Sequence, residues 1–230
     1  KSIKSSLDTQ LLYGDNFKLI KKYNGWQKIR INKDGYIGYI KNEKFPKPIQ
    51  SNFKVSVLKA RLFKRPNSKN KLKKFLPYES RLKITKKKAA FAKFENYWIK
   101  FSDIKKNNFK HNNIFKDIKL FKNIKYLWGG KSYKGIDCSA LVQIFFNQNN
   151  KYCPRDSKDQ EKYFTKKVKL KNIRKNDMIF WKGHVAVAIS RNKLIHAYGP
   201  MKRVVIMDIK KTIEKIYKTA NLRVTSIRRY

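Results

Sequence analysis

The stretch KGIDCSALVQIFFNQ, residues 134–148, decides the fold of the carboxyl-terminal half of this chain. Apolar residues fill it almost without interruption after its polar start, on every side of a helical wheel. This pattern predicts a mostly buried helix over residues 138–147. Because this helix is apolar on every side, the segments that follow have to cover it.

The first turn of this predicted helix holds three residues with polar or reactive side chains, Asp137, Cys138 and Ser139. Asp or Ser at such a position accepts hydrogen bonds from backbone N–H groups that the helix leaves free. A thiol at the positive end of a helix dipole ionises more readily, and a neighbouring imidazolium strengthens the effect. Cys138 is therefore a candidate nucleophile, although a lone Cys at a helix start is also a common core residue.

Short apolar runs after residue 175 predict a small antiparallel sheet that contains two histidines. His184 follows Gly183 at the start of one run, where a general base is accessible. His196 lies on the next run and is a candidate for accepting the other ring proton of His184. Whether the two share a face depends on the register of their hairpin. The predicted strands are residues 178–181, 184–189 and 194–197, the last two joined by a turn at 190–193.

The amino-terminal part reads as two small all-β domains, over residues 1–46 and 51–105. Short apolar runs alternate with Asn-Gly and Asp-Gly turns, which is typical of antiparallel barrels. The first barrel lacks an opening strand, so we expect it to be truncated at its amino end. The prolines at 46 and 48 suit a linker between the two barrels.

A polar connection near residue 106 introduces the third domain, predicted over residues 106–230. Apolar residues at helical spacing predict an amphipathic helix over residues 113–125. The fold class predicted for the whole chain is α+β: one mixed domain with a buried helix and an antiparallel sheet, preceded by two β barrels.

The chain is strongly basic, with 58 Lys and Arg against 15 Asp and Glu and a formal net charge of +43 over 230 residues. The positive charge is spread evenly and consists mostly of lysine, so it does not resemble the focused face of a specific nucleic-acid reader. A composition drift of the whole proteome and a selected attraction to an anionic partner both account for it. No window approaches the roughly 18 apolar residues of a membrane span.

Two cysteines, Cys138 and Cys153, are too few for a disulfide framework, and a free working thiol fits better. The sequence has no phosphate-cradling glycine loop, dinucleotide fingerprint or zinc-ligand spacing, so no cofactor or metal is implied.

The carboxyl-terminal part resembles the NlpC-type cell-wall peptidases, a papain-like cysteine peptidase family, and the amino-terminal part resembles bacterial Src-homology-3-like (SH3-like) barrels. Five motifs in order carry the first resemblance, and the pattern from Asn24 to Ile40 carries the second. The five motifs are Tyr126-Leu-Trp-Gly-Gly130, Gly135-Ile-Asp-Cys-Ser139, Pro154-Arg-Asp-Ser-Lys-Asp-Gln160, Asn176-Asp-Met-Ile-Phe-Trp-Lys-Gly-His184 and Leu194-Ile-His-Ala197.

The resemblance implies hydrolysis of the amide between the γ-carboxyl of D-glutamate and a diamino acid, usually meso-diaminopimelate, in peptidoglycan stem peptides. It implies that Cys138 attacks the carbonyl, His184 transfers the proton and His196 orients His184. Tyr126 matches the family tyrosine that helps to hold the oxyanion beside the Cys138 backbone N–H.

The residues implied to bind substrate are Asp137, Ser139 and Ser157. In related enzymes with barrels, the positions that match Asp137 and Ser139 help to bind a free amino-terminal L-Ala-D-Glu unit. Helix capping explains Asp137 and Ser139 equally well. Arg155 and Asp156 are expected to pair within their own loop and to take no part in catalysis.

The expected partner is therefore an L-Ala-γ-D-Glu-diamino acid stem peptide. A catalytically inactive or weak binder of cell wall or other anionic polymers is the alternative, against which the intact Cys138, His184 and His196 set argues. A free nucleophilic Cys favours a reducing compartment, and murein peptides to be recycled lie in the cytoplasm, so the expected location is cytoplasmic. A periplasmic or cell-envelope location is the alternative if residues precede Lys1 in the full protein.

Overall fold

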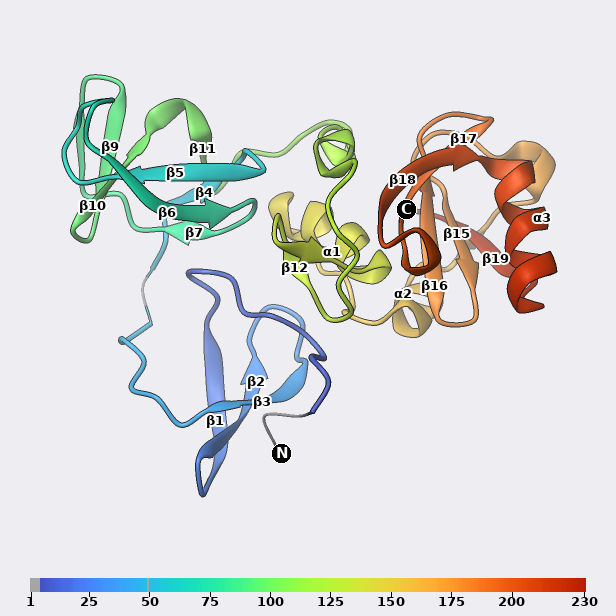
Figure 1. Cartoon of the computed structure of the whole chain (residues 1–230), viewed down its shortest axis with the longest axis horizontal. Helices are drawn as coiled ribbons and strands as arrows, with labels where there is room; N and C mark the ends of the chain where they lie inside the picture. Colours follow the sequence, from blue (N-terminus) through green and yellow to red (C-terminus); the bar gives the residue numbers. More distant parts are fainter. Residues whose placement is uncertain (1–4, 49) are drawn as a thin grey trace. The chain divides into compact units, whose positions relative to one another are not determined.

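The computed structural model describes residues 5–48 and 50–230, so the first four residues of the predicted domain 1–46 lie outside the described part. The described chain separates into two compact units (Figure 1). The first unit runs to Lys110 and includes residues 147–150, and the second contains residues 111–146 and 151–230.

The first unit opens with a three-stranded antiparallel sheet in the order β1-β2-β3. Gly25, in the predicted Asn-Gly turn, has φ +72°, a conformation that glycine adopts without strain. The Asp34 carboxylate accepts a hydrogen bond from the Tyr36 N–H at 3.0 Å, which closes the second turn. The predicted strands are confirmed: β1 (Phe17–Tyr23), β2 (Trp26–Ile31) and β3 (Ile37–Lys41).

Two further antiparallel sheets form the rest of the first unit, in the orders β6-β5-β10-β9-β8 and β11-β4-β7. Apolar residues from both sheets, Val55, Ala60, Leu82 and Ile99 among them, are fully buried in one core. The elements are β4 (Phe53–Val55), β5 (Lys59–Phe63), β6 (Lys71–Pro77), β7 (Arg81–Leu82), β8 (Lys86–Lys88), β9 (Phe91–Phe94), β10 (Tyr97–Lys100), η1 (Phe101–Asp103) and β11 (Ile104–Lys106).

A buried ion network joins the first sheet to the rest of this unit. Lys33 Nζ contacts Asp15 Oδ1 at 2.6 Å and Glu79 Oε1 at 2.8 Å, and both carboxylates are buried. Burial lowers the pKa of Lys33, but the attraction of Glu79 and Asp15 outweighs it, so the pKa is raised overall. Lys33 is therefore held in its charged form.

The second unit contains a six-stranded sheet in the order β14-β19-β15-β16-β17-β18, with helix α1 and helix α3 beside it (Figure 1). The predicted strands and helix are confirmed. Its elements are η2 (Ile118–Phe121), β12 (Lys131–Ser132), β13 (Gly135–Ile136), α1 (Cys138–Gln148), α2 (Ser157–Tyr163), β14 (Lys166–Lys167), η3 (Leu170–Asn172), β15 (Met178–Trp181), β16 (His184–Ala188), β17 (Lys193–Tyr198), η4 (Gly199–Met201), β18 (Arg203–Asp208), α3 (Ile209–Ala220) and β19 (Val224–Arg229).

Residues 113–125 do not form the amphipathic helix that the sequence predicts. This segment contains turns and the single short 3₁₀ helix η2. Its buried side chains Phe115, Ile118 and Phe121 recur at every third position. That spacing matches the 3.0 residues per turn of a 3₁₀ helix, whereas an α-helix has 3.6, so the prediction was wrong about the period.

Helix α3 begins and ends with defined caps and packs against the sheet. The Asp208 carboxylate accepts a hydrogen bond from the Lys211 N–H at 3.1 Å, and Asn221 ends the helix in the left-handed conformation. Its buried face, with Ile209 and Ile216, joins the core cluster of the sheet.

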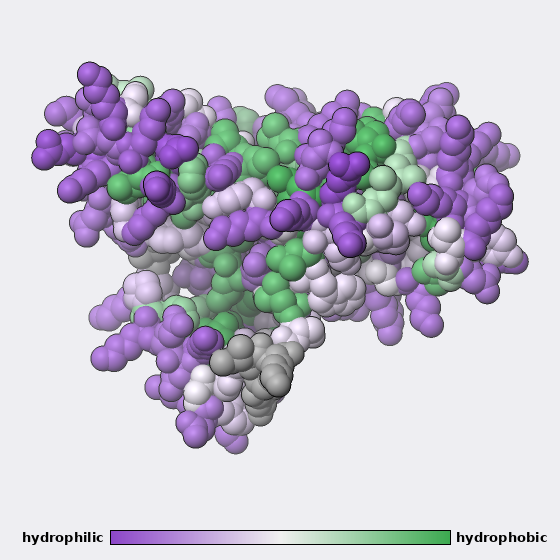
Figure 2. Space-filling view, viewed as in Figure 1, coloured by the Kyte–Doolittle hydropathy of each residue, from purple (hydrophilic) through white to green (hydrophobic). Residues whose placement is uncertain are grey.

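Hydrophilic residues cover most of the face visible in Figure 2, as the lysine content leads one to expect. Within the described part of the chain, none of the helices is both long and apolar enough to cross a membrane.

Candidate active site

Cys138 is the first residue of α1, and the Asp137 side chain caps the helix beside it. Asp137 Oδ1 accepts a hydrogen bond from the Ala140 N–H at 2.8 Å, and Oδ2 accepts one from the Gly129 N–H at 2.9 Å. These two bonds satisfy one free N–H of the helix and fix the preceding loop against it. The thiol is therefore held at a rigid helix start, with only 6% of the residue exposed.

The loop before Cys138 depends on glycine because its backbone segments approach one another closely. A Cβ on Gly130 would lie 2.5 Å from the Gly135 carbonyl oxygen, and one on Gly135 would lie 2.5 Å from the Leu127 Cβ. Any side chain at either position would push the loop apart. The two glycines thus explain how this motif brings Gly129 to Asp137.

Arg155 lies against Asp137 and completes a buried polar network beside the nucleophile. Its Nη2 contacts Asp137 Oδ2 at 2.5 Å, and its Nη1 contacts Asp137 Oδ1 at 3.0 Å and Ser139 Oγ at 2.9 Å. The Ser139 hydroxyl donates in turn to Asp137 Oδ1 at 3.2 Å. The ion pair of Arg155 with Asp137 was not predicted from the sequence, and the charge of Asp156 in the loop of Arg155 acts on the guanidinium as well. A sequence with 58 basic residues gives no signal that singles out Arg155.

The two predicted histidines meet across adjacent strands. His184 Nε2 lies 2.8 Å from His196 Nδ1. The register pairs Val187 with Ile195 and Ala188 with Leu194, so His184 and His196 form a diagonal pair on one face of the sheet. This resolves the question of register that the sequence left open.

Aromatic rings hold both imidazoles in place. Tyr198 stacks on His196 with ring centroids 4.6 Å apart and an interplanar angle of 11°, and Trp181 lies 5.6 Å from His184. Sequence reasoning did not identify either aromatic as part of the site. A signal was present, since Trp181 lies three residues before His184 and Tyr198 lies two residues after His196.

The Cys138 thiol lies beside the start of β16. It accepts hydrogen bonds from the backbone N–H groups of Val185, the residue after His184, and of Ser139. With His184 Nε2 engaged by His196, Nδ1 is the ring nitrogen left for proton exchange with the thiol. The residues predicted as nucleophile, base and orienting group thus lie in one part of this unit.

Burial sets the resting charge of these groups. It raises the pKa of Cys138 to about 12, with the Asp137 carboxylate adding to the rise, and it lowers the pKa of His184 from 6.5 to about 4. Burial therefore favours the thiol and the neutral imidazole at neutral pH. A neutral imidazole is the form that can accept the proton of the thiol.

The remaining predicted site residues lie near this centre. Burial, followed by the charges of Cys138 and Asp137, raises the pKa of Tyr126 to about 12, so its hydroxyl remains a donor. Ser157 begins α2, and Gln160 in the same helix donates to the Ser139 carbonyl at 2.9 Å. The roles of Tyr126 in holding an oxyanion and of Ser157 in binding substrate stay predictions.

The folded protein is expected to lose stability as the pH falls from about 6.5 to about 4. The pKa of His184 is depressed by burial, so the unfolded chain binds more protons than the folded one in this window. The cost for His184 alone is about 3 kcal/mol once the window is crossed. Urea unfolding at pH 7 and pH 4.5 measures it. The His184→Gln variant should show a smaller pH dependence, and an equal loss in both proteins would contradict the expectation.

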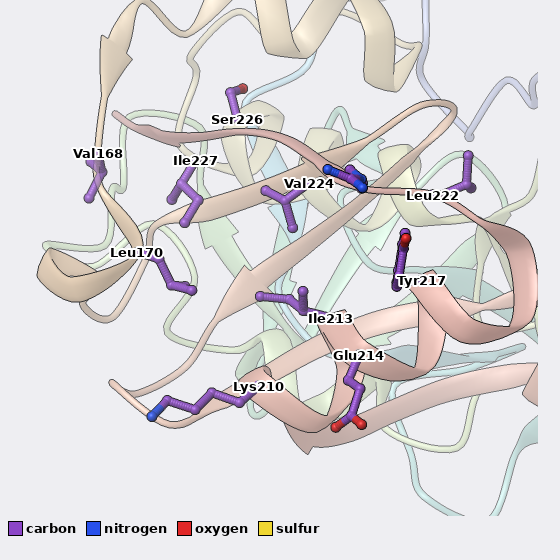
Figure 3. A pocket seen from close by; sticks show the side chains of 11 residues that line it. Val168, Leu170, Lys210, Ile213, Glu214, Tyr217, Leu222, Val224, Ser226 and Ile227 are labelled. Carbon is purple, nitrogen blue, oxygen red and sulfur yellow. The ribbon is translucent and has the colours of Figure 1, made fainter.

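A large apolar groove in the same unit is separate from these residues. It has a volume of about 690 Å³ between α3 and β19 and is lined by residues such as Ile213, Leu222 and Ile227 (Figure 3). None of the predicted catalytic residues lines it.

Comparison with known proteins finds matches in both parts of the chain. Residues 123–223 match the NlpC/P60 family, and residues 2–45 match the bacterial dipeptidyl-peptidase Sh3 domain. A gamma-D-glutamyl-L-lysine dipeptidyl-peptidase of Bacillus subtilis (strain 168) is 26% identical over 232 residues, which cover 90% of this chain and 77% of the relative.

Two further comparisons concern the peptidase domain and the fold. A murein DD-endopeptidase MepS/murein LD-carboxypeptidase of Escherichia coli (strain K12) is 34% identical over 83 residues, which cover 34% of this chain and 44% of the relative. The crystal structure of an NlpC/P60 family protein from Bacillus cereus covers 97% of this chain and 82% of that chain, with a TM-score of 0.79 and 22% identity.

A buried helix that begins with a cysteine and a sheet that contributes paired histidines, with the family match over residues 123–223, define a papain-like cysteine peptidase domain. Residues 123–223 belong to the NlpC/P60 family, with a bacterial SH3 domain before them.

Proposed function

We propose that this enzyme hydrolyses the amide between the γ-carboxyl of D-glutamate and a diamino acid in peptidoglycan stem peptides, and that it prefers a free amino-terminal L-Ala. The observation that carries the chemistry is the contact of His184 with His196 beside the Cys138 thiol. The name of the Bacillus subtilis relative, which this chain matches over 90% of its length, supports the choice of bond.

The first half of the reaction forms an acyl-enzyme. The Cys138 thiol transfers its proton to His184 Nδ1, and its sulfur attacks the γ-carbonyl of D-glutamate. The oxyanion is stabilised by the Cys138 backbone N–H and the Tyr126 hydroxyl. His184 then returns the proton to the amine of the diamino acid, which leaves as the C–N bond breaks.

The second half releases the dipeptide. His184 removes a proton from water, the hydroxide attacks the thioester, and the thiol leaves with that proton. His196 Nδ1 accepts a hydrogen bond from the Nε2–H of His184 throughout and keeps the Nδ1 of His184 directed at the reacting atoms. The products are L-Ala-D-Glu and a free diamino acid, or the peptide that begins with it.

Preference for a free amino end requires a negative or accepting group near the substrate amine. Asp137 and Ser139 are the proposed contacts, and Ser157 is proposed to contact the substrate as well. The Asp137 carboxylate already binds Arg155 and two backbone N–H groups, so its position is fixed. A fixed carboxylate suits recognition of an ammonium group. The proposal extends to a cytoplasmic location, because stem peptides with a free amino end arise when murein peptides are released and recycled.

Four synthetic peptides test the proposal. They are L-Ala-γ-D-Glu-meso-diaminopimelate and L-Ala-γ-D-Glu-L-Lys, each with a free and with an acetylated amino end. We expect mass spectrometry to show L-Ala-D-Glu from a free peptide and at least about tenfold slower cleavage of its acetylated form. Absence of cleavage in all four would contradict the peptidase proposal, and equal rates for free and acetylated forms would contradict the amino-end preference.

A further inference from the structure

The histidine pair continues to a third side chain that the mechanism has not used. His196 Nδ1 faces His184, and His196 Nε2 lies 3.5 Å from the sulfur of Met207. Met207 lies on β18, where the register pairs it with Leu194 and pairs His196 with Val205. His184, His196 and Met207 thus form a diagonal row across three neighbouring strands, on one face of the sheet.

The direction of the protons along this row follows from the chemistry. If His184 acts as the base through Nδ1, its proton must sit on Nε2 and be donated to His196 Nδ1. His196 must then carry its own proton on Nε2, which points at Met207 Sδ. The opposite tautomer of His196 would place two protons between the histidines and would direct a lone pair at the lone pairs of the sulfur.

Protein atoms enclose the His196 ring. Its side chain is fully buried, and Tyr198 stacks on its ring. Among the described residues, Met207 Sδ is the acceptor that faces Nε2. A thioether is a weak acceptor and cannot donate, so it favours the N–H form of Nε2 without adding a charge.

We propose that Met207 is a positioning residue that holds His196 in the Nε2–H tautomer and thereby directs His184 toward Cys138. The inference rests on the proposed function for its effect on turnover, while the tautomer itself can be measured without any substrate. A carboxylate at this position would instead attract a positive charge onto the imidazole row. The neutral sulfur matches the neutral resting state of the buried histidines.

Nitrogen NMR of the wild-type protein tests the tautomer directly. The chain has three histidines, so ¹⁵N-histidine labelling gives three rings, and the His111→Gln variant identifies one of them. We expect two-bond ¹H–¹⁵N spectra to show His196 protonated at Nε2. A His196 ring that carries its proton on Nδ1 would overturn the proposal, whether or not any variant folds.

Two substitutions at Met207 separate the acceptor from the packing. Met207→Leu keeps most of the volume and removes the acceptor, and Met207→Gln supplies a stronger acceptor. We expect Met207→Leu to mix the His196 tautomers and to lower kcat about tenfold with KM unchanged, and Met207→Gln to recover most of the loss. Met178→Leu is the control, because Met178 is a buried methionine of the same sheet. It should keep the wild-type His196 tautomer, kcat and KM.

The rate of Cys138 alkylation by iodoacetamide, read by peptide mapping, gives a second measure that needs no peptide substrate. Met207→Leu should slow it and Met207→Gln should restore it. A Met207→Leu protein with wild-type tautomer, alkylation rate and kcat would overturn the proposal. Failure of the proposed function alone would appear differently, as a wild-type protein with the expected tautomer that cleaves none of the four peptides.

Discussion

Replacing Cys138 with alanine is expected to lower kcat/KM for the cleaved stem peptide by about 10⁴-fold or more, since the covalent intermediate forms on this sulfur. The hydroxyl of the adjacent Ser139 cannot take over. The Ser139 hydroxyl is already committed to Asp137 and Arg155, at 3.2 and 2.9 Å. Turnover assays with the free and the acetylated peptide measure the loss.

The fold should tolerate this change because the Cys138 side chain is small and lies at a helix start. Circular dichroism melting curves of the variant should match those of the wild type. Cys153→Ala is the matched control: it removes the second buried thiol, whose backbone carbonyl still accepts a hydrogen bond from Gln143 at 3.0 Å. If the Cys138→Ala protein keeps more than one tenth of the wild-type activity and is alkylated at Cys153, the assignment of Cys138 as the nucleophile is refuted.

Arg155→Met is expected to lower the free energy of unfolding by about 3–5 kcal/mol. Arg155 and Asp137 are both buried, and Met keeps an unbranched apolar side chain in place of the arginine stem while removing its charge. The Asp137 carboxylate would keep its two backbone N–H donors but lose its cation, and an uncompensated charge inside a protein is costly. Urea denaturation at pH 7 measures the change.

A second substitution distinguishes the buried charge from lost packing. Arg155→Met combined with Asp137→Asn removes both charges, so it should recover part of the stability that Arg155→Met loses. Arg223→Met, on an exposed arginine of the same unit, should change stability by less than about 0.5 kcal/mol. If the loss of unfolding free energy in the double variant equals the sum of the losses in the two single variants, Arg155 and Asp137 are not coupled.

The Arg155 network also bears on the chemistry. Asp137 raises the pKa of the Cys138 thiol, and Arg155 opposes that effect. Losing Arg155 should therefore make the thiol harder to deprotonate, in addition to loosening the helix start. A residue expected to be only a loop contact thus becomes a support of the nucleophile.

Local patterns predicted the elements that carry the site. The apolar run after Cys138 predicted α1, and turn residues with short apolar runs predicted β15, β16 and β17 within one or two residues. Such predictions succeed where burial is nearly complete, because the pattern then reflects one environment. Residues 113–125 were mispredicted because three- and four-residue spacings overlap in a short segment, and only packing chose the 3₁₀ turn.

The sequence by itself determined which chemistry is available: a thiol at a helix start, two histidines on neighbouring strands and no metal-ligand spacing. The tertiary structure decided which groups meet. The register of three strands aligned His184, His196 and Met207, and chain folding brought Arg155 to Asp137. The physical reason is that hydrophobic periodicity is a local property, whereas register and buried polar pairing are set by packing between segments distant in sequence.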